Sequence, residues 1–181
     1  MAVLPLCIYG DPVLRAKAKT VTEVTDEHRK LIEDMYETMD ANNGVGLAAP
    51  QIGINLRIAV LGIPGKKDKV THMALINPEW SNPLGELSED EGCLSVPGLY
   101  EEVRRVKEVD VKALNEKGEP IEFTCEGLFA RAVQHEVDHL KGMLFFDRIS
   151  VLRRQRMKKD LKSLERGRGV ASSAGSEPSE E

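Results

Sequence analysis

The sequence predicts an α+β fold: a single compact domain with small antiparallel or mixed sheets around a central helix, followed by a C-terminal helix. The length of 181 residues suits one domain, and 41% hydrophobic with 30% charged residues is typical of a globular protein. Helical and strand-like patterns are mixed along the chain without regular alternation, which disfavours a doubly wound α/β fold. Aromatic residues make up only 4%, so we expect aliphatic side chains to form most of the core.

Turn residues divide the N-terminal half into short elements. Apolar side chains recur at helical spacing from Asp26, the predicted N-cap, to Ala41, and the sequence Asn-Asn-Gly at 42–44 ends this helix. A glycine-bearing loop is predicted over 44–51. The other elements expected here are a short helix, a buried strand and an exposed turn, at 13–15, 57–63 and 64–69.

A hairpin and two helices are predicted in the C-terminal half. Residues 103–114 alternate in places, and 121–125 follow a turn at 115–118, so these two strands should pair. The central helix is predicted over 128–140, closed by Gly142. The remaining elements are a short strand at 73–77, a polar loop or edge strand at 81–92, and a second helix at 151–166.

The central helix carries the sequence His-Glu-Val-Asp-His at 135–139. Positions four apart share one helix face, so His135 and His139 can bind one metal ion. Glu136 can reach a water on that ion and act as a general base. The alternative is a pair of partly exposed surface histidines. Because the chain has only four histidines, their spacing around a glutamate favours the metal site.

A catalytic metal site of this kind normally has three protein ligands. No histidine follows His139, so the third histidine of the extended metalloprotease pattern is absent. Cys93 follows a glycine that allows close approach of the backbone, and it is either the third ligand or a buried structural cysteine. One cysteine and two histidines as ligands would by themselves suggest zinc.

Three motifs together resemble the signature motifs of the peptide deformylase family: GVGLAAPQIG at 44–53, EGCLSVP at 91–97 and QHEVDHLKG at 134–142. Their order and separation also match. The resemblance implies Cys93 as the third ligand and ferrous iron as the natural metal, with zinc, nickel or cobalt able to replace it. The implied reaction removes the formyl group from the N-terminal formyl-methionine of newly made bacterial-type polypeptides.

The resemblance also implies how the motif residues act. Metal-bound hydroxide attacks the formyl carbon, while Glu136 accepts the water proton and delivers it to the leaving amine. The backbone N–H of Leu94 and the side-chain amide of Gln51 would stabilise the oxyanion. The alternative for Gln51 is an amide that caps the loop.

The same resemblance gives expectations for substrate binding. Gly44 and Gly46 would let the peptide pair with the backbone like an added strand, although Gly44 also fits a helix C-cap. Val45 and Leu128 are candidates for the apolar pocket of the methionine side chain.

Arg131 lies one helical turn before His135 and therefore on the same helix face. Many members of the family have an apolar residue at this position. We expect the Arg131 stem to line the methionine pocket while its guanidinium group pairs with Glu91.

The last predicted helix is basic, although the chain as a whole is acidic. Residues 151–168 contain eight Lys or Arg and two acidic residues, a net charge of +6, whereas the whole chain carries −5. In the family this helix can contact the ribosome, and the alternative is a solvated amphipathic helix. We therefore expect a catalytic domain over 1–150, a basic helix over 151–168 and a disordered tail over 169–181.

Composition excludes several other classes of protein. The sequence has no apolar stretch long enough to span a membrane, and we expect no signal peptide. Three cysteines indicate a reducing cytoplasm. We expect no membrane partner and no specific DNA. One alternative function is a metalloprotease, disfavoured by the EGCLS motif and by the lack of a third histidine downstream. Another is a non-enzymatic RNA- or ribosome-binding protein that uses the basic helix, which would need neither Glu136, Gln51 nor a metal. A catalytically inactive relative is disfavoured because every motif residue is present.

Overall fold

The computed structural model describes residues 2–64 and 70–173, with side chains described up to residue 167. In these residues one five-stranded antiparallel sheet has the strand order β1-β2-β3-β4-β5. The strands are Gly46–Ala48, Ile58–Pro64, Val70–Cys93, Val96–Leu114 and Pro120–Glu126, in order. The α-helices are α1 (Asp26–Ala41), α2 (Gly127–Leu140) and α3 (Val151–Ser173), and the 3-10 helices are η1 (Pro12–Arg15), η2 (Ala49–Ile52) and η4 (Phe145–Asp147). The α+β prediction is confirmed, with one sheet in place of several.

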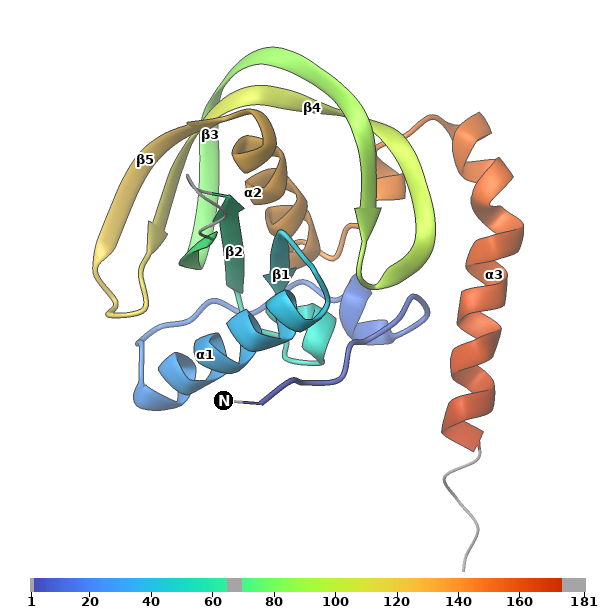
Figure 1. The fold of residues 1–181 in the computed structure, drawn as a ribbon, viewed down its shortest axis with the longest axis horizontal. Helices are drawn as coiled ribbons and strands as arrows, with labels where there is room; N and C mark the ends of the chain where they lie inside the picture. The colour runs from blue at the N-terminus through green and yellow to red at the C-terminus, as the bar shows by residue number, and fades with distance from the viewer. Residues whose placement is uncertain (1, 65–69, 174–181) are drawn as a thin grey trace, which may run out of the picture.

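Strands β3 and β4 form a long bent hairpin that arches around α2 (Figure 1). β2 pairs with β3 only from Val70 to Ile76, so the rest of β3 pairs with β4 alone. Register shifts after Ile76 and Ser81 bend the hairpin, as β-bulges do. Residues 81–92 are therefore an edge strand, the second of the two predicted alternatives, and not a loop. The predicted strand at 73–77 is only part of β3. The polar sequence of 81–92 reflects a strand with few buried side chains.

The helix α2 packs into the concave side of the sheet. Ala130, Val133 and Val137 are buried together with Val109 and Val111 of β4. After Leu140, Gly142 adopts a φ of +75°, and a Cβ there would lie 2.5 Å from the backbone oxygen of Arg15. The predicted end of the helix at this glycine is confirmed.

The N-terminal half differs from the prediction in two places. Helix α1 has the predicted bounds, but its N-cap is Thr25 and not Asp26. The backbone of Thr25 is extended, and its N–H donates to His28 Nδ1 at 3.1 Å. The segment predicted as a loop over 44–51 contains strand β1 and the start of η2. The strand was not predicted because it begins with Gly46, and glycine is uncommon in strands. Of the predicted turn at 64–69, only Pro64 lies in the described residues.

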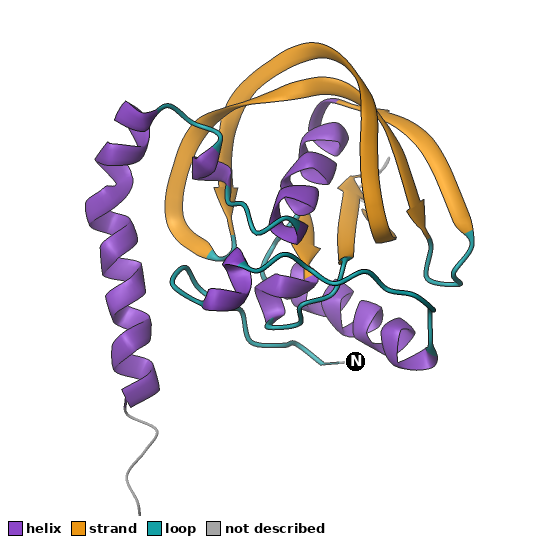
Figure 2. Cartoon of the chain, turned by 180° about the vertical axis from the view of Figure 1, so that it is seen from behind, coloured by secondary structure: helices purple, strands orange, loops and turns teal. Residues whose placement is uncertain are grey.

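Helix α3 runs along one side of the molecule (Figure 2). Met157 and Leu161 pack with Val96, Val103 and Phe146 in a separate apolar cluster. The helix continues to Ser173, beyond both the predicted helical pattern at 151–166 and the predicted basic segment at 151–168. Residues 174–181 of the predicted tail lie outside the described residues. None of the described helices combines the length and apolar character needed to cross a membrane.

Candidate active site

A cavity of about 570 Å³ opens between the segment before β1, the turn joining β3 to β4, and α2. Of the twelve site residues that the sequence predicts, only His139 does not line it. The lining includes Gly44, Val45, Gly46, Gln51, Glu91, Cys93, Leu94, Leu128, Arg131, His135 and Glu136. His139 lies behind this surface and is almost fully buried. The fold thus brings all three sequence motifs to one place.

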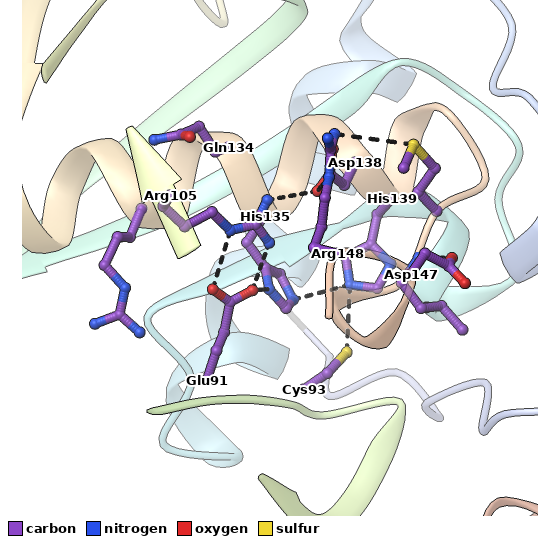
Figure 3. A network of polar contacts seen from close by, with 12 residues as sticks. Glu91, Cys93, Arg105, Gln134, His135, Asp138, His139, Asp147 and Arg148 are labelled. Carbon is purple, nitrogen blue, oxygen red and sulfur yellow. Dashed lines mark hydrogen bonds and ion pairs between the residues drawn. The ribbon is translucent and has the colours of Figure 1, made fainter. Parts of the chain in front are cut away.

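Cys93, His135 and His139 form a cluster in which one donor atom of each lies within 4.8 Å of the others (Figure 3). Cys93 Sγ lies 3.3 Å from His139 Nε2, which lies 3.1 Å from His135 Nε2. Cys93 is the last residue of β3, and the two histidines come from successive turns of α2. One thiol and two imidazoles are a common donor set for zinc and other transition metals.

The electrostatics of this cluster fit a cation. Burial acts to lower the pKa of His135, but contacts with Cys93 and Glu91 raise it well above its usual range. Burial and the neighbouring His135 lower the pKa of His139 well below its usual range. These directions favour a positive charge at His135 and a neutral imidazole at His139, and a neutral imidazole is the form that binds a metal ion.

The carboxylate of Glu91 orients His135 from behind. Glu91 Oε1 lies 2.6 Å from His135 Nδ1, which leaves Nε2 directed toward His139. Burial alone would raise the pKa of Glu91, but hydrogen bonds from His135 and Arg105 lower it to about 2. Glu91 is therefore an ionised carboxylate that accepts from the imidazole.

Arg131 lines the cavity, but its predicted pairing with Glu91 is wrong. Its Nη1 contacts the carboxylate of Glu89, and its Nη2 donates to the backbone oxygen of Asp90 at 2.8 Å. Glu91 is instead held by Arg105, an arginine of β4. The sequence did not point to Arg105, because its contact with Glu91 depends on the register between β3 and β4.

Glu136 is buried beside the cluster at the point where β1 approaches α2. A Cβ on Gly46 would lie 2.4 Å from Glu136 Oε1, so only glycine leaves room for this carboxylate. Glu136 Oε2 is buried with no hydrogen-bond partner among the described residues. Burial raises the pKa of Glu136 to about 7, and a nearby metal cation would oppose this shift.

Gln51 and the turn after Cys93 border the cluster on its other side. Gln51 Oε1 accepts from the Ala48 N–H at 2.8 Å, so the side chain does cap its loop. Its Nε2 lies 3.5 Å from Cys93 Sγ and 3.3 Å from Ser95 Oγ. Leu94 lies in the two-residue turn between Cys93 and Val96 and lines the cavity.

Three exposed apolar side chains line the outer part of the cavity, together with the polar Asn43 and Asp90. Val45 and Leu128 are 39% and 49% exposed, and Tyr100, which sequence reasoning missed, is 72% exposed. A Cβ on Gly92 would lie 2.4 Å from the Tyr100 ring, so this glycine lets the ring pack across the hairpin.

Three charged residues behind the cluster were also missed: Arg105, Asp138 and Arg148. A signal for Asp138 was present, because it lies within the His-Glu-Val-Asp-His sequence itself. Arg105 occupies a buried position of an alternating strand, where an apolar residue would be usual.

Comparisons with known proteins agree with one another. Residues 3–155 match the family model described as polypeptide deformylase. The chain is similar to peptide deformylase 1 of Burkholderia multivorans, with 48% identity over 168 residues covering 92% of this chain and 91% of that protein. It is also similar to a solved peptide deformylase from Legionella pneumophila, with 43% identity and a TM-score of 0.83. The match covers 93% of this chain and 98% of that structure. A solved peptide deformylase from Ehrlichia chaffeensis, in complex with actinonin, is 32% identical, with a TM-score of 0.84 and coverage of 92% and 98%.

Proposed function

The chain belongs to the peptide deformylase family of metal-dependent hydrolases, and we propose that its cavity removes the formyl group from the N-terminal formyl-methionine of newly made polypeptides. One observation carries this proposal: the donor atoms of Cys93, His135 and His139 converge beside the buried carboxylate of Glu136. We place this reaction in the cytoplasm, where nascent chains carry their formyl group and where free cysteines remain reduced.

We propose that Cys93, His135 and His139 hold the metal, with ferrous iron as the natural ion and zinc, nickel or cobalt as substitutes. When bound, such an ion lowers the pKa of a water molecule and polarises the formyl oxygen. Glu91 keeps the imidazole of His135 in the tautomer whose Nε2 is free to bind a cation. The preference for iron rests on the resemblance to the family.

Glu136 is the general base in this proposal. Its carboxylate takes a proton from the attacking water and passes it to the nitrogen of the leaving amine. Its position beside His135 leaves it available for this transfer, since no described residue donates a hydrogen bond to its Oε2. The backbone N–H of Leu94 and the Nε2 amide of Gln51 donate to the oxygen that gains negative charge.

The peptide binds in the same cavity. Val45 and Leu128 provide apolar surface for the methionine side chain, and the Arg131 stem adds to this wall. The backbone at Gly44 and Gly46 pairs with the extended peptide like an added strand. The absence of side chains at these two positions allows the close approach that such pairing needs.

We also propose that α3 contacts the ribosome. Between 151 and 167 only Met157 and Leu161 are buried, so most of the basic side chains face solvent. Exposed Lys and Arg side chains on one helix suit the phosphates of ribosomal RNA. The alternative is a solvated helix that only covers the apolar cluster below it.

The experiment that tests the proposed reaction compares the parent protein with Glu136→Ala. Both are loaded with iron without oxygen and given a formyl-methionine peptide and its unformylated equivalent. We expect the parent to release formate from the first peptide only and Glu136→Ala to be at least ~10²-fold slower. Cleavage of internal peptide bonds by the parent would instead favour the metalloprotease. No reaction with a folded, metal-loaded parent would contradict the proposed function.

A further inference from the structure

A series of ion pairs leads from His135 through the protein interior toward the surface (Figure 3). The first contact joins His135 Nδ1 to Glu91 Oε1. Arg105 then holds the same carboxylate with two donors: Nε lies 3.1 Å from Oε2, and Nη2 lies 2.5 Å from Oε1. This paired geometry fixes the carboxylate plane and therefore the direction in which it contacts the imidazole.

Asp138 continues the series and contacts two arginines. Arg105 Nη1 lies 2.5 Å from Asp138 Oδ2. Arg148 approaches from the other side, with Nε 3.1 Å from Oδ2 and Nη2 2.6 Å from Oδ1. The side chains of Arg105 and Asp138 are each 3% exposed, whereas that of Arg148 is 38% exposed. Arg148 is thus the solvent-facing end of the series.

The charges of these residues explain why a second arginine is present. With His135 as a neutral metal ligand, Glu91, Arg105 and Asp138 alone would place a net charge of −1 in the protein interior, and an unbalanced buried charge is costly. Arg148 brings the sum to zero. It also holds both oxygens of Asp138, so Arg105 can keep two of its donors on Glu91.

Without Arg148, the ionised Asp138 would have only Arg105 as a cationic partner among the described residues. Attraction to Asp138 would then draw the Arg105 guanidinium group away from Glu91. A less tightly held Glu91 would allow the His135 ring to rotate and would misdirect its Nε2 atom. Mutating a residue that orients a metal ligand through a hydrogen bond commonly weakens metal affinity about 10- to 100-fold.

We infer that Arg148 is a positioning residue for His135, acting through Asp138, Arg105 and Glu91, and that it strengthens metal binding from outside the cavity. Arg148 does not line the cavity, so it contacts neither the substrate nor the proposed ligand atoms directly. This inference rests on the proposed metal site. It assigns a supporting role to Arg148, which directly follows η4 in the chain.

The test is a titration of the metal-free protein with Co²⁺ against a competing chelator, followed by the visible absorption of the bound ion. We expect Arg148→Gln to fold and to bind Co²⁺ about 10-fold more weakly than the parent, with altered absorption bands. Arg148→Lys keeps the charge but loses the two-donor geometry, and we expect an intermediate affinity. The matched control is Arg154→Gln, which removes an ion pair with Asp147 in the same segment. We expect parental affinity from this control.

The outcomes separate this inference from the proposed function. If the parent does not bind Co²⁺, the metal site itself is wrong, and the inference fails with it. If the parent and Arg148→Gln bind Co²⁺ equally and with the same absorption, only the positioning role is overturned. If Arg148→Gln does not fold, Arg148→Lys decides: a weaker affinity supports the role, and a parental affinity overturns it.

Discussion

Helices α2 and α3 differ in whether their charged residues are buried or exposed. Nine of the fourteen residues of α2 are buried, and five of these nine are polar or charged. Across 151–167 of α3, only Met157 and Leu161 are buried, and the Lys and Arg side chains remain mostly in solvent. Burying polar groups is costly unless each has a partner. Contacts of Gln134 and Asp138 offset part of this cost in α2, whereas Glu136 Oε2 is buried with no hydrogen-bond partner among the described residues. On α3, Arg153 and Arg154 form ion pairs with the body, and the exposed lysines remain available for a partner.

The comparison predicts large effects on turnover near α2 and small effects on α3. After the loss expected for Glu136→Ala, the largest loss of turnover is expected for a change at Gln51. Gln51→Ala removes the amide proposed to stabilise the oxyanion, and we expect kcat to fall about 10²- to 10³-fold. The matched variant is Gln51→Glu, which keeps an oxygen to accept from the Ala48 N–H but loses the donor. A Gln51→Glu protein that is folded and turns over at the parental rate would exclude the proposed role.

Gly46 tests how closely β1 and α2 fit together. The methyl group of Gly46→Ala would meet Glu136 Oε1 at 2.4 Å and its Cδ at 2.9 Å, so the carboxylate must move. Displacing a catalytic group by about 1 Å costs on the order of 10²-fold in rate, and we expect a loss of that size in kcat.

The control for this variant is Gly44→Ala. Its methyl group would lie 3.0 Å from Leu94 Cδ1, the end of a side chain that can shift. We expect a smaller loss of turnover than in Gly46→Ala. Steady-state kinetics with equal bound metal in both proteins is the measurement, and equal losses would argue against a specific contact with Glu136.

A smaller effect is expected at Arg131, where α2 meets β3. Arg131→Ala removes the contact with the Glu89 carboxylate and the hydrogen bond to the Asp90 oxygen. Because the Glu89 side chain is half exposed, we expect a loss of about 1 kcal/mol in the free energy of unfolding. We expect KM for a formyl-methionine peptide to rise about 3- to 10-fold as the pocket wall loosens. Unchanged stability together with unchanged KM would remove Arg131 from the substrate site.

Much of the fold and the site was predictable from local patterns. Helix α1, the β4–β5 hairpin and the C-terminal end of α2 follow from periodicity and from turn residues such as Gly142. The spacing of His135 and His139 placed both on one helix face, as the structure has them. These features depend on neighbouring residues in the chain, which is why the sequence alone predicts them.

The features that were missed depend on contacts between distant segments. The second half of β3 is polar, so its sequence left a loop and an edge strand open, and only pairing with β4 decides for the strand. The pairing of Arg105, not Arg131, with Glu91 depends on strand register, which composition does not reveal. The role of Gly46 is visible only once β1 lies against Glu136. Motif resemblance predicted a set of site residues, eleven of which line the cavity, but not the interactions that hold them.

The smallest effect on turnover is expected on α3, at Lys158, Lys159 and Lys162. Replacing all three by Glu reverses the charge of an exposed surface and leaves the buried contacts of Met157 and Leu161 intact. We expect less than a 2-fold change in kcat/KM for a short formyl-methionine peptide. Binding to ribosomes should weaken strongly, because contacts between cationic side chains and phosphates are electrostatic. Co-sedimentation with ribosomes at several salt concentrations measures this loss.

The control must have the same change in net charge at another place. Replacing the exposed Lys17, Lys19 and Lys117 by Glu alters the charge of the main body by the same amount. If both triple variants lose ribosome binding equally, net charge explains the effect, and α3 has no special role. If only the α3 variant loses binding while its peptide turnover stays parental, ribosome contact and catalysis belong to separate surfaces. Slower peptide turnover in the α3 variant alone would instead show that the helix supports the site, because α3 packs on Val96 and Val103 of the hairpin that carries Cys93.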